Sequence, residues 1–140
     1  MTTKQYLNQA NSLNRRIKLL QAEIEKLREM STSISVNLNS DKVQTSSEHD
    51  KLANAVAQIL EKEESLAATI VLYNDSKEII KRQIEELDST AHIDVLYGRH
   101  IVGLSFFNIS IMVGKKERQT FNIYNDAMKA FEEKYGHLYK

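Results

Sequence analysis

The feature that most constrains the fold of this chain is the absence of proline from all 140 residues. Proline removes a backbone donor and disrupts a helix interior, so a chain without it can form long uninterrupted helices. Over the first two thirds of the chain, apolar residues also alternate by four and by three positions, which is typical of helices with an apolar seam. The sequence therefore predicts an all-α fold that begins with two long helices.

Two such seams can be traced. The first consists of Leu13, Ile17, Leu20, Ile24 and Leu27. The second consists of Leu52, Val56, Ile59, Leu66, Ile70, Tyr73, Ile80, Ile84 and Leu87, with Glu63 and Lys77 as its charged members. The polar stretch 39–47 between the seams predicts a connection, so we expect a long antiparallel, coiled-coil-like helical hairpin over residues 1–90. The two charged members either extend to the surface or fix the register and the choice of partner.

A second apolar set lies beside the second seam, at Leu60, Ala67, Val71 and Ile79. A two-helix hairpin cannot cover the seam and this set together. We therefore predict a homodimer or a higher homo-oligomer in which the seam residues mediate oligomerisation. The long helices can pair either within one chain or between chains.

Residues 91–140 predict a small helix-turn-helix domain. After a break at Gly103, Ser105 can cap a new helix, and Phe106, Ile109 and Val113 then fall on one face, which must be buried. Residues 99–124 would thus contain a helix, a tight turn and a second helix.

The second helix should begin near Lys116, after a turn in which Gly114 adopts a positive φ. Ser110 is the small residue expected where the two helices cross. Helical spacing places Thr120, Ile123, Ala127, Met128 and Phe131 on the inner face.

Basic and amide side chains then lie on the outer face, where the first residues of a recognition helix meet base edges. Arginine and lysine suit guanine, and asparagine and glutamine suit adenine. The predicted DNA-contacting residues are Arg99, Ser105, Lys115, Lys116, Glu117, Arg118, Gln119, Phe121, Asn122 and Asn125. The alternative is a small helical domain with a solvated polar face.

Three neighbouring residues allow two interpretations each. Phe121 either touches a thymine methyl group or packs against the N-terminal helices. Phe107 docks either on the long helices or on a partner protein. Gly98 is either a joint or a site of close helix packing, since glycine costs about 1 kcal/mol in a helix interior.

One stretch resembles the C-terminal part of small phage transcription regulators of the ArpU and RinA kind. It is Arg99-His100-Ile101-x-Gly103-Leu104-Ser105-Phe106-x-x-Ile109, followed by Gly114, Arg118-Gln119 and Phe121-x-Ile123-x-x-x-Ala127-Met128. The opening Tyr6-Leu7-x-x-Ala10-x-x-Leu13-x-x-Arg16-Ile17 is similar to the start of the same proteins. Those regulators look like region 4 of sigma factors. The resemblance implies an activator of late genes of a phage or mobile element.

Charge and composition fit a small regulator of this kind. The chain has 19 basic and 19 acidic residues, but residues 98–140 hold 7 basic and 4 acidic ones, so the positive balance lies with the predicted reading domain. We expect double-stranded DNA as the partner, with RNA polymerase as a second candidate. The competing hypothesis is a coiled-coil interaction module that binds a protein such as polymerase, a repressor or a capsid component. DNA affinity that depends strongly on salt would favour the first hypothesis.

The sequence gives little support for catalysis. The four histidines are isolated, there is no cysteine, and no glycine-rich phosphate loop occurs, so we expect no enzyme, no metal and no cofactor. No apolar run approaches the length that spans a bilayer, and the polar start does not resemble a signal peptide. We therefore expect no membrane association and a cytoplasmic location.

Overall fold

The computed structural model describes residues 1–39 and 46–140, and this part of the chain is all-α, as predicted. The helices in chain order are α1 (Thr3–Leu7), α2 (Gln9–Asn39), α3 (Ser46–Glu85), α4 (Thr90–Leu96), the π-helix η1 (Tyr97–Val102), α5 (Phe106–Val113), α6 (Glu117–Tyr135) and the 3₁₀ helix η2 (Gly136–Leu138). They form two compact units, one of Met1–Leu13 with Leu72–Lys140 and one of Asn14–Val71. The predicted connection at 39–47 lies largely outside the described residues.

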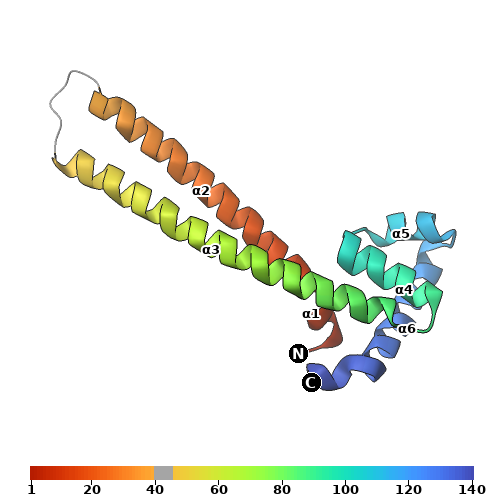
Figure 1. Cartoon of the computed structure of the whole chain (residues 1–140). Coiled ribbons are helices and arrows are strands. Elements are labelled where there is room, and N and C mark those ends of the chain that lie inside the picture. Colours follow the sequence, from red (N-terminus) through yellow and green to blue (C-terminus); the bar gives the residue numbers. More distant parts are fainter. Residues whose placement is uncertain (40–45) are drawn as a thin grey trace. The chain divides into compact units, whose positions relative to one another are not determined.

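The unit Asn14–Val71 is a helical hairpin, in which α2 and α3 run side by side in opposite directions (Figure 1). Ile17, Leu20 and Ile24 on α2 are buried, as the first seam predicts. Two ion pairs also join the helices, Arg28 with Glu63 and Lys62 with Glu23. Glu63, a charged member of the second seam, therefore has a partner at the surface of the hairpin.

The second seam differs from its prediction at two positions. Ala55 and Thr69 are buried, whereas the predicted members Val56 and Ile70 are 44% and 37% exposed. At both places the buried residue lies one position before the predicted one, and it has a small side chain. Val56 and Ile70 therefore lie outside the seam that this unit forms by itself.

The other unit has a single apolar core to which distant segments contribute. It comprises Leu7, Ile80, Ile84, Leu87, Val95, Leu96, Ile109, Tyr124, Ala127 and Phe131. Among the predicted oligomerisation residues, Ile80, Ile84 and Leu87 are thus packed inside this core of their own chain. The end of α3 packs in the C-terminal unit, and the role of the seam in oligomerisation stays a prediction.

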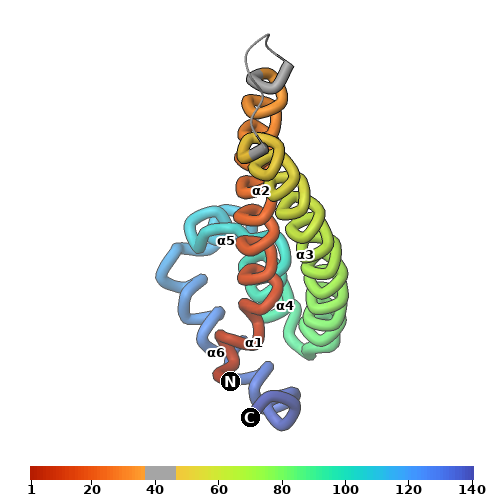
Figure 2. Tube along the Cα trace, turned by 90° about the vertical axis from the view of Figure 1, so that its left-hand side faces the viewer, coloured from red at the N-terminus to blue at the C-terminus, as the bar shows by residue number. Residues whose placement is uncertain are grey.

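The N-terminal segment is held in this core by specific contacts. The ring of Tyr6 stacks on Tyr139 at 4.4 Å, and its hydroxyl donates to Gln83 Oε1 at 2.8 Å. The hydroxyls of Thr3 and Tyr139 lie 2.8 Å apart. The two ends of the chain accordingly lie close together beside α1 (Figures 1 and 2). We predicted domains of residues 1–90 and 91–140, whereas the compact unit that contains α4 to α6 also includes α1 and the end of α3.

Candidate nucleic-acid interface

The predicted helix after Ser105 is present as α5. The Ser105 hydroxyl accepts a hydrogen bond from the Asn108 backbone N–H at 3.2 Å, which caps the helix. Ile109 is buried, and Phe106 and Val113 are half-buried on the same side, as the spacing predicts.

A three-residue turn joins α5 to α6. Gly114 has φ +70°, a backbone conformation that favours glycine, and its N–H donates to Ile111 O at 3.3 Å. Lys115 N–H donates to Ser110 O at 3.0 Å, and Ser110, the small residue expected at the helix crossing, is buried. Two helices joined by a short glycine-containing turn form a helix-turn-helix unit.

The inner face of α6 is set by helical spacing. Thr120, Ala127 and Phe131 are buried as predicted, and Ile123 is half-buried. Tyr124, which the sequence analysis did not place in the core, is buried as well. This side of α6 is therefore occupied by the protein itself, and the opposite side is left to solvent.

The outer side of the turn and of α6 carries most of the predicted DNA-contacting residues. Lys115, Lys116, Glu117, Arg118, Gln119, Asn122 and Asn125 are all exposed. Arg118, Asn122 and Asn125 follow one another at intervals of four and three, so they lie in one stripe along the helix. Lys116 stands at the N-cap of α6, where its ammonium group has no acceptor to offer the first backbone N–H groups, and no side-chain cap is present. The surface offers donors and acceptors for base edges next to positive charge.

Three further predicted residues, Arg99, Ser105 and Phe121, use their side chains in contacts within the unit. Half-buried Arg99 donates to Leu104 O at 3.1 Å, and its guanidinium lies 4.6 Å from the ring centre of Phe106. The Ser105 hydroxyl is engaged as the cap of α5. Phe121 packs edge-on against Phe106 with ring centres 5.3 Å apart, yet it remains 48% exposed. It thus has a packing partner on α5 within the unit and an exposed face beside the stripe.

A buried polar link behind α6 involves His100, which the sequence presents only as one of four isolated histidines. His100 is 2% exposed, and its Nδ1 lies 3.1 Å from Asn8 Oδ1 and its Nε2 lies 3.0 Å from the Tyr124 hydroxyl. Because an amide oxygen only accepts, Nδ1 donates to Asn8 and Nε2 accepts from Tyr124. Burial, helped by the positive charges of Arg99 and Lys4, lowers the pKa of His100 to about 4. The neutral imidazole joins η1 to α6 and to Asn8, the residue between α1 and α2.

A second surface of the unit is apolar. A groove of about 520 Å³ between α4, η1 and α5 is lined mainly by Ile93, Tyr97, Val102, Leu104, Ile109 and Met112, with the acidic Glu85 and Asp94 also among its lining residues. Met112 is 73% exposed, and Phe107 and Ile111 on α5 are also exposed. Gly98 lies in this region, where an added Cβ would stand 3.3 Å from Ile109 Cγ1, so glycine here allows close packing.

No three histidine or acidic side chains in residues 1–39 and 46–140 are placed to hold a metal ion. No helix in the same ranges combines the length and the apolar character that are needed to cross a membrane.

Comparisons of the chain with protein-family models, with curated proteins and with solved structures gave no significant match.

Proposed function

We propose that this protein is a sequence-specific DNA-binding transcription regulator that reads DNA with the helix-turn-helix of α5 and α6. The observation that carries this proposal is the division of α6 into two sides. One side is fixed in the core by Thr120, Ala127 and Phe131, and the other presents Arg118, Asn122 and their neighbours to solvent. A helix held in this way can enter the major groove without rearrangement of the unit.

The resemblance to phage regulators of the ArpU and RinA kind extends the proposal to an activator of late genes of a phage or mobile element. RNA polymerase is then a candidate protein partner, and the cytoplasm is where the regulator acts. The hairpin supports assembly into a homodimer or a higher oligomer, since it leaves Val56, Leu60, Ile70 and Val71 exposed. Two reading helices in one particle would compensate for the small number of phosphate contacts that a weakly basic unit makes.

The test is selection of bound fragments from a random DNA pool, followed by affinity measurements on the selected sequence. The double variant Arg118→Ala/Asn122→Ala should lose the preference for this sequence. Removal of two base contacts costs about 1–3 kcal/mol each, which corresponds to about a thousandfold at the middle of that range. Both side chains are exposed, so helicity should not change.

A matched control removes the same residue types elsewhere in the same unit. Arg82 and Asn74 are exposed on α3, and the variant Arg82→Ala/Asn74→Ala should bind the selected sequence like the unaltered protein. If the pool yields no enriched sequence, or if the α6 variant binds as tightly as the control, this surface does not read DNA.

The second candidate function is a protein-interaction module. The observation that favours it is the apolar surface of α5, where Phe107, Ile111 and Met112 are exposed beside the groove. The two candidates differ in how binding responds to salt, because phosphate contacts weaken steeply as the salt concentration rises. A protein complex that persists with or without DNA, together with DNA affinity that is insensitive to salt, would favour the interaction module.

A further inference from the structure

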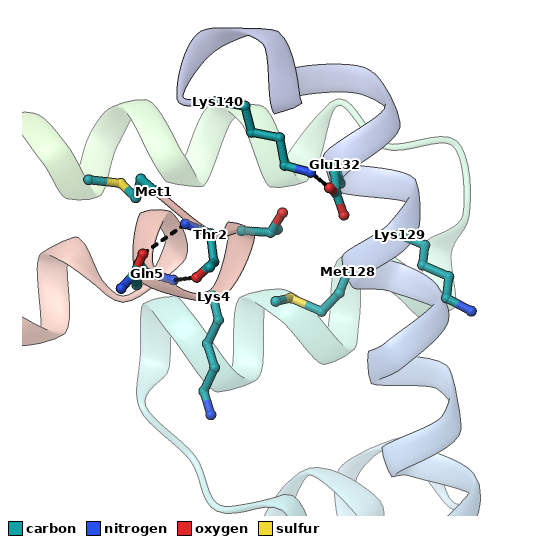
Figure 3. A pocket seen from close by; sticks show the side chains of 9 residues that line it. Met1, Thr2, Lys4, Gln5, Met128, Lys129, Glu132 and Lys140 are labelled. Carbon is teal, nitrogen blue, oxygen red and sulfur yellow. Dashed lines mark hydrogen bonds and ion pairs between the residues drawn. The ribbon is translucent and has the colours of Figure 1, made fainter.

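A second basic site lies beside α6, at the opposite end from the turn. A pocket of about 520 Å³ is lined by α1 and the neighbouring residues on one side, and by Met128, Lys129 and Glu132 of α6 with Lys140 on the other (Figure 3). Three lysines line it, of which Lys4 and Lys129 come from segments that are far apart in the sequence. Neither of these two is among the predicted DNA-contacting residues.

The charges of this pocket are only partly neutralised. Lys140 forms an ion pair with Glu132, the only acidic residue among the described residues that line the pocket. In the described part of the chain, neither Lys4 nor Lys129 has an ion-pair partner. Figure 3 shows both of these side chains pointing away from the Lys140–Glu132 pair. Two free positive charges therefore remain.

Both lysines are placed relative to the reading surface by the framework of the unit. Lys129 follows Arg118, Asn122 and Asn125 by the same four- and three-residue steps, so it continues their stripe along α6. Lys4 lies close enough to the buried His100, which binds Tyr124 of α6, to contribute to the lowering of its pKa. The contacts of Tyr6 and Thr3 with Tyr139 hold α1 in this position.

The distance along α6 from Arg118 to Lys129 indicates which part of bound DNA Lys129 would contact. Lys129 lies eleven residues after Arg118, which corresponds to about 16 Å of helix. The major groove is about 12 Å wide, so a helix that enters it with its first turns has its later turns at the level of the phosphate backbone. At that position a lysine contributes a phosphate contact and no base contact.

We propose that Lys4 and Lys129 form a phosphate-binding clamp, which anchors the DNA backbone at the end of α6 and is distinct from the base-reading residues. This inference rests on the proposed function, since it assigns the backbone contacts of the same DNA complex. It gives the N-terminal segment a direct part in binding, in addition to its part in the core.

The test measures the affinity of the full-length protein for a mixed-sequence DNA duplex of 40 base pairs as a function of salt. Lys4→Gln/Lys129→Gln removes both charges and keeps long polar side chains. Each phosphate contact contributes about 0.9 to the slope of log affinity against log salt, so the slope should fall by about 2. At 0.1 M salt this corresponds to a loss of roughly tenfold to hundredfold in affinity. The loss should be equal for all sequences, because the contacts are to phosphates.

Two controls make the result specific. Lys81→Gln/Arg82→Gln removes the same number of charges from α3 in the same unit and should leave the slope unchanged. Lys4→Arg/Lys129→Arg keeps the charges and should bind as the unaltered protein does. Circular dichroism should give the same helicity for Lys4→Gln/Lys129→Gln as for the unaltered protein, because both lysines are exposed.

The outcomes separate this inference from the proposed function. If the unaltered protein binds DNA and the Lys4→Gln/Lys129→Gln variant has the same salt slope, the clamp is wrong and the reading surface stands. If the unaltered protein does not bind any duplex, the proposed function fails and the clamp fails with it.

Discussion

At the scale of single residues, His100 connects three segments that the sequence keeps apart. Its two ring nitrogens are both hydrogen-bonded, to Asn8 and to Tyr124, and its side chain has almost no contact with solvent. A protonated imidazole would lie buried near two further positive charges, and the Tyr124 hydroxyl would have to change from donor to acceptor toward Nε2. The folded unit therefore favours the neutral form of His100.

This requirement predicts a specific dependence of stability on pH. The pKa of His100 is about 4 in the folded protein against an ordinary value of 6.5, so between these values the unfolded state binds more protons. The stabilisation is therefore complete above pH 6.5 and is lost as the pH falls toward 4. The shift corresponds to about 3 kcal/mol in the free energy of unfolding. Urea unfolding at a series of pH values measures it.

Carboxylates also titrate in this range and change the stability as well. A comparison of the unaltered protein with the variant His100→Gln isolates the contribution of His100. Glutamine does not titrate, and the difference in unfolding free energy between the two proteins should narrow between pH 6.5 and 4. A constant difference over this range would show that the imidazole is not held neutral.

At the scale of elements, the hairpin of α2 and α3 leaves one apolar surface of α3 exposed. Within Asn14–Val71 it presents Ala55 and Thr69 to the interior, and Val56, Leu60, Ile70 and Val71 remain exposed. We call these four residues the α3 stripe. Val56, Leu60 and Val71 recur at helical spacing and Ile70 lies next to Val71, so together they form one surface that a second copy of the chain can bury.

We expect the variant Val56→Ser/Ile70→Ser to shift the protein toward the monomer. A fully buried valine or isoleucine contributes at least about 1.5 kcal/mol, so two of them correspond to about a hundredfold increase in the dissociation constant. Light scattering over a range of protein concentrations measures this change. Ala57→Ser/Ala68→Ser alters exposed residues of α3 beside the α3 stripe and serves as the control. Equal masses for all three proteins at every concentration would exclude the α3 stripe as an interface.

At the scale of the whole molecule, the helix-turn-helix does not form a core with its neighbours in sequence alone. Leu7 and the α3 residues Ile80, Ile84 and Leu87 are buried in the same core as Ala127 and Phe131. Residues 91–140 by themselves would expose the apolar surface that these segments cover. The compact unit therefore depends on residues from both ends of the chain.

This dependence predicts that Leu7→Ala destabilises the unit strongly, although it lies about a hundred residues before α5. Removal of a buried leucine side chain costs about 2–5 kcal/mol. Leu19→Ala changes the same residue type at an exposed position on α2, and its effect should stay within about 0.5 kcal/mol. Chemical unfolding followed by circular dichroism measures both. Equal stability of the two variants would mean that the N-terminal segment is not part of the core.

The sequence by itself determined the helical character, the hairpin, and the positions of the cap at Ser105 and the turn at Gly114. These features depend on local spacing and on the backbone preferences of single residues, which can be read along the chain. The exposed stripe on α6 was predictable for the same reason, because it is the complement of an apolar face with helical periodicity.

Only the tertiary structure decided which distant segments complete the core. The spacing of apolar residues on α3 does not distinguish burial against α2, burial in the C-terminal unit or exposure, so Ile80 and Val56 looked equivalent although one is buried and the other is not. The link from Asn8 through His100 to Tyr124 left no local signal either, because its hydrogen bonds join residues 92 and 24 positions apart. A sequence pattern reports the face on which a residue lies, whereas the partner that covers that face is fixed when the chain folds.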